Sequence, residues 1–96
     1  MALFGFFKRK RNRDIFAERR AHLLAHGRIT DGRIIDTETN GRGDEIVYYL
    51  YTLNGFDYES SELLSEEKRR EPLLYAPGAK VGVRYDPKNQ GNSMLV

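Results

Sequence analysis

Three side chains that can bind a metal recur at helical spacing near the N-terminus. Glu18, His22 and His26 stand at i, i+4 and i+8, which places them on one stripe of a helix. Carboxylate and imidazole groups are common ligands of Zn²⁺. This stripe lies opposite the apolar side of the same helix, where solvent-exposed residues are expected, and no further ligand is evident in the chain. We therefore interpret the three residues as solvent-exposed and predict no metal site.

Residues suited to acid–base or nucleophilic catalysis form no convincing group. The chain has no cysteine, which excludes thiolate chemistry and disulfides. Asp57, Glu59 and Glu62 belong to a charged stretch typical of a solvent-exposed face. Asp86 precedes Pro87, and such an aspartate commonly caps its own turn through an Asx-type hydrogen bond. We predict no catalytic residue, no cofactor and no enzymatic activity.

The charge of the chain is divided unevenly between its two ends. Residues 1–28 carry eight basic and two acidic groups, a net charge of +6, whereas residues 29–96 carry eight basic and twelve acidic groups, a net charge of −4. Attraction to phosphate should therefore come from the N-terminal end. The first thirteen residues join an aromatic patch to a polybasic patch. The apolar anchors are Phe4, Phe6 and Phe7, and the cations are Lys8, Arg9, Lys10, Arg11 and Arg13.

Three interpretations of this segment remain open. The aromatic rings could insert into a membrane surface while the cations attract anionic lipid. The same cations could neutralise nucleic-acid phosphates, with barrel tyrosines as stacking platforms, although the strand region is net acidic. Third, the segment could be a solvated lead-in to the helix, with function in protein contacts made by the β-domain. We favour the third interpretation, followed by the first.

Size and composition indicate one small domain. The chain has 96 residues, of which 40% are hydrophobic and 31% charged. It contains no apolar run near the roughly 18–20 residues of a membrane-spanning helix. A secretory signal is not expected, because the positive charges follow the apolar residues Leu3–Phe7 instead of preceding them. We expect a cytoplasmic protein, with peripheral attachment to a membrane as the variant described above.

The helix predicted directly after the polybasic segment has sequence signals at both of its ends. Asp14 suits an N-cap and Gly27 suits the position after the last turn. Phe16, Leu23 and Leu24, with Arg20 between them, share the apolar side. We divide the chain into a tail (1–13), an amphipathic helix (14–27) and a β-domain (28–96).

The β-domain shows five strand candidates separated by short turns. The candidates are residues 28–39, 45–53, 56–60, 81–85 and 93–96. Asn54-Gly55 is a strong signal for a two-residue hairpin, and residues 65–70 read as one helical turn. We predict a mainly β, α+β domain: an antiparallel five-stranded meander curled into an open barrel or strongly twisted sheet. SH3-like and OB-like barrels are both admissible.

The second strand is apolar on both faces, so each face is expected to pack against another part of the protein or against a partner. Val47, Tyr49 and Tyr51 occupy one face, while Tyr48 and Leu50 occupy the other. We expect the N-terminal helix to cover the outer face, with a dimer partner or a membrane-bound neighbour as the alternative. Tyr48 and Leu50 are the candidate interaction surface. The predicted core comprises Ile35, Val47, Tyr49, Tyr51, Phe56, Tyr58, Val81, Val83 and Tyr85.

Residues 27–96 resemble the bacterial family named domain of unknown function 3592. The resemblance rests on the strand after Gly27, on the segment Tyr49–Tyr58 and on Gly78–Asn89, where a valine-alternating strand leads into Tyr85-Asp86-Pro87. The family has no general enzymatic activity attached to it and is commonly found beside membrane helices. This chain departs from that pattern, because a basic amphipathic helix stands where a membrane helix is usual.

Together these observations predict a non-catalytic β-module that binds an unidentified protein, with tethering to an anionic membrane surface through its basic N-terminus as an added feature. A small nucleic-acid-binding barrel is the alternative. The oligomeric state stays open, and a dimer is admissible.

Overall fold

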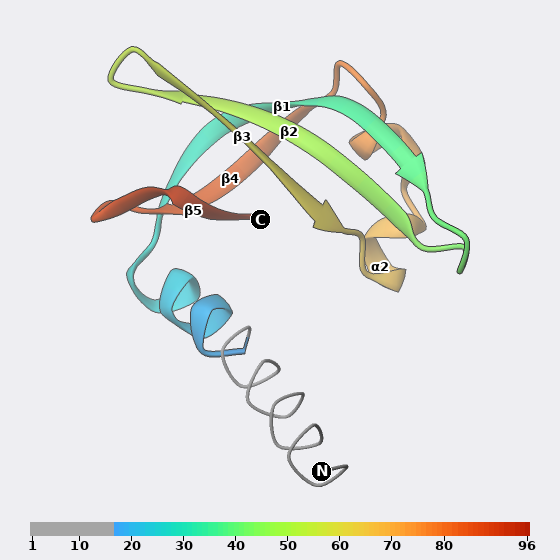
Figure 1. The fold of residues 1–96 in the computed structure, drawn as a ribbon, viewed down its shortest axis with the longest axis horizontal. Coiled ribbons are helices and arrows are strands. Elements are labelled where there is room, and N and C mark those ends of the chain that lie inside the picture. The colour runs from blue at the N-terminus through green and yellow to red at the C-terminus, as the bar shows by residue number, and fades with distance from the viewer. Residues whose placement is uncertain (1–16) are drawn as a thin grey trace, which may run out of the picture.

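The computed structural model describes residues 17–96, which form a helix followed by five strands (Figure 1). The N-terminal helix covers residues 17–26; its predicted start at Asp14 lies outside the described residues. The elements that follow are β1 (Arg28–Thr39), β2 (Glu45–Leu53), β3 (Phe56–Leu63), α2 (Glu66–Arg69), the 3-10 helix η1 (Pro72–Tyr75), β4 (Lys80–Asp86) and β5 (Asn89–Leu95). The strand predictions are confirmed, except that β3 extends past residue 60 and β5 begins before residue 93.

Local sequence signals explain the turns between the strands. Asn54 and Gly55 both have positive φ, 53° and 84°, as a type I′ hairpin turn between β2 and β3 requires. Ser65 caps α2 by accepting a hydrogen bond from the Lys68 amide. Asp86 accepts a hydrogen bond from the Lys88 amide at 2.9 Å, which confirms the predicted Asx-type turn between β4 and β5.

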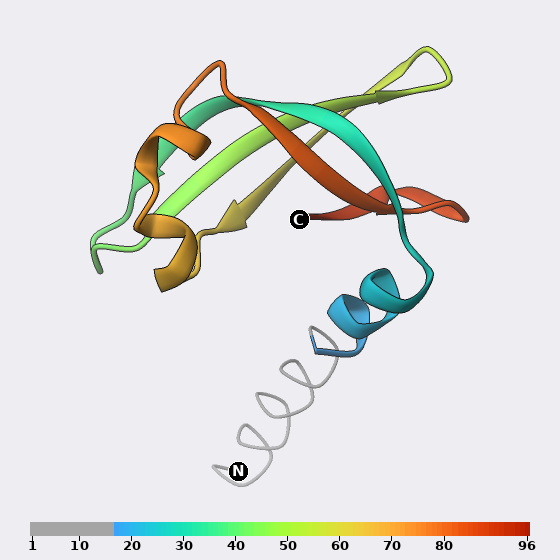
Figure 2. The ribbon, with the colours of Figure 1, turned by 180° about the vertical axis from the view of Figure 1, so that it is seen from behind.

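The strands form one antiparallel sheet in the order β3-β2-β1-β4-β5, curled into a nearly closed barrel. The predicted meander is correct for each hairpin but wrong for the step from β3 to β4, which do not pair. Instead β1 pairs with β2 along its second half and with β4 along its first half. The chain crosses from β3 to β4 through α2 and η1 (Figure 2). This Greek-key order corresponds to the OB-like alternative, because an SH3-like barrel pairs its first four strands consecutively.

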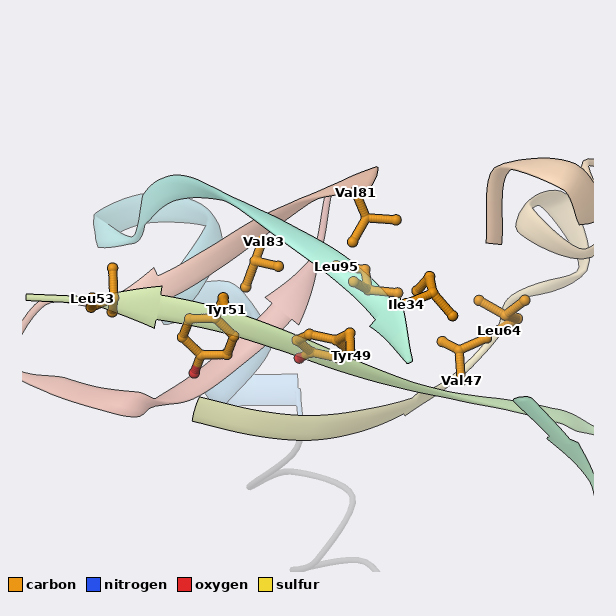
Figure 3. Packing of buried hydrophobic residues seen from close by; sticks show 9 residues of the cluster. All are labelled: Ile34, Val47, Tyr49, Tyr51, Leu53, Leu64, Val81, Val83 and Leu95. Atoms are coloured by element: carbon orange, nitrogen blue, oxygen red, sulfur yellow. The ribbon is translucent and has the colours of Figure 1, made fainter. Parts of the chain in front are cut away.

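The core fills the barrel with alternate residues from the strands (Figure 3). Val47, Tyr49 and Tyr51 point inward from β2 and are at most 1% exposed. They contact side chains of the other elements, and Tyr58 and Tyr85 pack at the margin of this cluster. The remaining buried members are Ile34, Leu53, Leu64, Val81, Val83 and Leu95. The inner face of β2 is therefore the centre of the barrel, as predicted.

Two residues of the predicted core lie outside it. Ile34 is fully buried opposite Tyr49, so Ile35, the next residue of the strand, points to the other face and is 37% exposed. The pairing of β1 with β2 then shifts register between Ile34 and Asp36. Such a bulge adds one residue and exchanges the faces of all residues beyond it. Phe56 is 69% exposed because it closes the hairpin beyond the end of the barrel.

The N-terminal helix does not cover the outer face of β2, contrary to prediction. It lies beside β4 and β5 at the opposite side of the barrel (Figures 1 and 2). Leu23 is the buried residue of this helix, at 1% exposed, while Leu24 is 54% exposed. The amide of Gly27 donates to the Leu23 carbonyl at 2.8 Å, and β1 begins at the next residue. A linker this short holds the helix next to the first half of β1, which pairs with β4.

Candidate functional site

The outer face of β2 is an apolar row with no covering element among residues 17–96. Ile46, Tyr48 and Leu50 point away from the core at every second position and are half-buried by their neighbours on the same sheet. On β3, Leu63 lies opposite Ile46 and is 54% exposed. Three strands thus present a surface whose centre is aliphatic and aromatic. The alternation of β2 assigned Tyr48 and Leu50 to this outer side, but the N-terminal helix was expected to cover it.

Acidic side chains border this row on both sides. On β1, Glu38 pairs with Ile46 and Asp36 pairs with Tyr48. On β3, Glu59 pairs with Leu50 and Asp57 pairs with Thr52. Cross-strand partners lie on the same face of the sheet, about 4.5–5.5 Å apart at Cβ. We call this arrangement the outer β2 face; it consists of Ile46, Tyr48, Leu50 and Leu63 with the acids Asp36, Glu38, Asp57 and Glu59, and Arg33 beside Leu50 is a basic neighbour.

The tyrosine of this face is held by one of the acids. The Tyr48 hydroxyl donates to Glu38 Oε2 at 3.3 Å. The negative charge of Glu38 raises the pKa of Tyr48, with a smaller contribution from Asp36. An ionised phenol would be repelled by both carboxylates, so the ring keeps its hydroxyl as a donor. The electrostatic environment of Tyr48 is therefore negative, which favours cationic groups on any molecule that binds there.

The stripe of Glu18, His22 and His26, predicted from the sequence to be solvent-exposed, has one member in contact with the barrel. His22 and His26 are neighbours on the helix, with ring centroids 5.1 Å apart. His22 faces the barrel instead of bulk solvent alone, because its Nε2 atom lies 3.4 Å from Asp86 Oδ2. These side chains line a shallow hollow with Pro87 and Lys88. Within residues 17–96 no group of three or more His, Asp or Glu side chains is arranged to hold a metal ion.

The predicted lipid or phosphate contacts, Lys8 to Arg11 with Arg13, and the anchors Phe4, Phe6 and Phe7 lie outside the described residues. The structure therefore neither joins them to the outer β2 face nor separates them from it. In the part of the chain that the structure does describe, no helix has the length and apolar character needed to span a bilayer.

Sequence reasoning missed the side chains that close the barrel between β3 and β5. Glu62, expected on a solvent-exposed face, accepts from the Leu95 amide at 3.0 Å and from Lys68 Nζ at 3.2 Å. Lys68 Nζ also donates to the Leu95 carbonyl at 3.3 Å. A sequence signal for the inward direction of Glu62 did exist. The hairpin pairs Glu62 with Val47, and cross-strand partners point to the same face, so Glu62 points inward as Val47 does.

Two tyrosine hydroxyls of β2 also form hydrogen bonds to β5 across the barrel. The Tyr49 hydroxyl shares a hydrogen bond of 2.8 Å with Ser93 Oγ, and the Tyr51 hydroxyl donates to the Gln90 carbonyl at 2.7 Å. Burial raises the pKa of Tyr49 and Tyr51, and the hydrogen bonds oppose this shift only in part. These phenols are structural donors, and nothing beside them suggests proton transfer.

Comparison with known proteins identifies a family and no more. No curated protein matches the chain, and no solved structure does. The sequence model described as "Domain of unknown function (DUF3592)" matches residues 25–96. The matched region takes in the whole barrel and the last residues of the N-terminal helix. Because this match covers most of the sequence, the chain belongs to the DUF3592 family.

Proposed function

We propose that this chain is a non-catalytic β-domain that binds another protein through the outer β2 face. The partner surface that fits is apolar at its centre and carries Lys or Arg at its margin. It would bury Tyr48 and Leu50 and place its cations beside Asp36 and Glu59. Interfaces of this kind gain affinity from the buried aromatic and aliphatic centre and orientation from the charged rim.

The observation that carries the proposal is that β2 is apolar on both faces while only the inner one is used by the fold. An antiparallel strand with one solvated face normally alternates apolar and polar residues. Here Ile46, Tyr48 and Leu50 occupy the outer positions, and the N-terminal helix lies elsewhere. A half-buried apolar row of this kind, with no covering element among residues 17–96, favours association.

The alternative of nucleic-acid binding is less well supported. OB-like barrels that bind oligonucleotides use the face around strands 2 and 3. In this chain that region bears Asp36, Glu38, Asp57 and Glu59, which would repel phosphates. Aromatic stacking alone on Tyr48 would have to overcome this repulsion. Any affinity for nucleic acid should therefore come from the N-terminal segment and not from the barrel.

Membrane tethering through residues 1–13 is a separate part of the proposal. Five cations near an anionic surface contribute on the order of 1 kcal/mol each, and the phenylalanines add apolar insertion. Sedimentation with anionic and neutral vesicles tests this part, with a chain that begins at Asp14 as the control. Salt-sensitive binding that the shorter chain lacks would support tethering, and equal behaviour of both chains would remove it.

The protein contact is tested by site-specific photocrosslinking from the outer β2 face. A photoreactive phenylalanine analogue replaces Tyr48 in one variant and Leu73, which is 86% exposed on η1, in the control. A protein crosslinked from position 48 and not from 73 is then purified and its affinity measured. We expect Leu50→Ala and Asp36→Lys to weaken binding, each by about tenfold or more. Equal affinity of both variants and the parent chain would contradict the proposal.

A further inference from the structure

The two outermost strands of the sheet, β3 and β5, approach each other without pairing. They stand at opposite ends of the strand order, and no ladder joins them. Side chains bridge the space instead: Tyr58 donates to Gln90 Oε1 at 3.0 Å, and Glu62 accepts from the Leu95 amide at 3.0 Å. The barrel therefore has a seam whose two sides are strand edges held apart by side chains.

The hydrogen-bond parity of β3 shows which backbone groups face this seam. A two-residue hairpin closes with a hydrogen-bonded pair, here Leu53 and Phe56, and the Leu64 amide donates to the Glu45 carbonyl at 2.9 Å. The hydrogen bonds at both ends of β3 thus show that the backbone N–H and C=O groups of its even-numbered residues point towards β2. The N–H and C=O groups of Glu59 and Ser61 consequently point away from β2, towards the seam.

The same reasoning applies to β5. The Val96 amide donates to the Gly82 carbonyl at 3.0 Å, and Met94 pairs with Arg84. Ser93 and Leu95 therefore direct their backbone groups to the seam. Those of Leu95 are occupied by Glu62 and Lys68. Among residues 17–96, the backbone N–H and C=O of Ser93 have no corresponding partner.

A polar hollow of about 490 Å³ lies over this part of the seam. Its walls come from β3, β5 and the N-terminal helix, and they consist of short polar side chains, one glycine and one cation. The lining residues are Arg19, Ser60, Ser61, Asn89, Gly91, Asn92 and Ser93. No acidic side chain belongs to this lining, in contrast to the outer β2 face.

We propose that this seam is a second binding site, which takes an extended peptide segment of a partner protein by strand addition. The free edges of Ser61 and Ser93 supply main-chain hydrogen bonds, and the short side chains leave room for a backbone to approach. Arg19 selects a segment that carries a carboxylate side chain at the position facing the helix. This site uses the backbone edges at the seam, whereas the outer β2 face uses side chains; the two adjoin only at β3, where Ser61 pairs with Tyr48, so the site extends the proposed function.

The test uses the full chain and a defined probe, an acetylated and amidated peptide of eight alternating threonine and glutamate residues. Amide chemical shifts and hydrogen exchange are recorded during titration. We expect saturable shifts and slowed exchange at Ser61 and Ser93. A second probe has the same side chains but N-methyl groups at alternate positions, which remove its edge donors. This probe should not bind, and a third probe with lysine in place of glutamate should bind about threefold more weakly or worse.

A matched pair of variants checks the β3 edge. Ser61→Pro removes the amide that faces the seam while leaving the ladder with β2 intact, as proline at a strand edge can. We expect Ser61→Pro to lower the affinity for the acidic probe about tenfold, because a backbone hydrogen bond is lost. Ser61→Ala should change this affinity by less than about twofold. Circular dichroism establishes that both variants fold.

Several results would overturn the inference. These are the absence of saturable shifts at about 1 mM peptide, equal binding of the N-methylated probe, or shifts confined to the outer β2 face. If Ser61→Pro does not fold, the comparison of methylated and unmethylated probes on the parent chain decides by itself. Binding of the acidic probe that Leu50→Ala abolishes would assign it to the proposed protein-binding face instead, so the two sites are distinguishable.

Discussion

The barrel has two outer faces, and they differ in whether another element of the chain covers them. On the β4–β5 side, the N-terminal helix buries Leu23, and His22 lies beside Asp86. On the β1–β2–β3 side, Tyr48 and Leu50 have no covering element among the described residues. The difference follows from the chain connection, because Gly27 alone separates the helix from the half of β1 that pairs with β4. An apolar face is thus covered where the short linker places the helix, and it has no covering element among the described residues where the linker does not reach.

The largest effect is expected from removing the buried helix residue. Leu23→Ala should lower the free energy of unfolding by about 2–3 kcal/mol, since Leu23 is 1% exposed. Leu24→Ala, its neighbour at 54% exposed, should change it by less than about 0.5 kcal/mol. Urea denaturation of both variants measures the difference. Equal losses would mean that the helix is not docked through Leu23.

Alkaline pH should destabilise the barrel through the buried tyrosine Tyr49 on the inner face of β2. Burial raises the folded-state pKa of Tyr49 above its ordinary value near 10. The folded state therefore binds more protons above that pH, and its stability falls as pH rises from about 10 towards the folded pKa. Tyr49→Phe should make this decline shallower. Denaturation of the variant and of the parent chain at pH 8 and at pH values above about 10 measures the difference.

The contact between the helix and the β4–β5 turn should contribute less. His22→Ala removes the side chain that lies 3.4 Å from Asp86, and we expect a loss of about 0.2–1 kcal/mol in the free energy of unfolding, the range of exposed pairs. His26→Ala removes a neighbouring imidazole without that contact and serves as the control. Urea denaturation at low and high salt checks both variants, and a loss insensitive to salt would argue against an ion pair.

A similarly small effect on folding is expected on the uncovered face. Leu50→Ala should change the free energy of unfolding by no more than about 0.5–1 kcal/mol, because the side chain is only half-buried. The same variant should weaken partner binding. Leu50→Ala is thus expected to affect binding more than folding, and Leu23→Ala to affect folding more than binding. A loss of stability comparable to that of Leu23→Ala would show that the outer β2 face belongs to the fold itself.

Most of the secondary structure was predictable because its signals are local. The alternation of β2, the Asn54-Gly55 turn and the cap at Asp86 each act within a few residues, and all were confirmed. The errors fall where the pattern depends on distant partners. Ile34 and Ile35 are adjacent and point to opposite faces, and only the pairing register of β1 with β2 decides which of them is buried. The inward turn of Glu62 towards Leu95 likewise required knowledge of the β3–β5 seam.

The candidate site was predictable in part for the same reason. Tyr48 and Leu50 could be assigned to the outer face from period-two alternation alone. Their acidic border could not, because Asp36 and Glu59 come from two other strands and meet the row only through pairing register. The position of the helix was the remaining uncertainty, and it decides whether the face is free.

By itself the sequence determined the strands, the turns, the two-faced character of β2 and the membership of the DUF3592 family, since each rests on residue types and short spacings. The tertiary structure decided the order β3-β2-β1-β4-β5, the side on which the helix docks and the seam between β3 and β5. Those features depend on how segments far apart in the chain share one core, because a strand edge or an apolar face can be satisfied by any compatible partner that the connections allow.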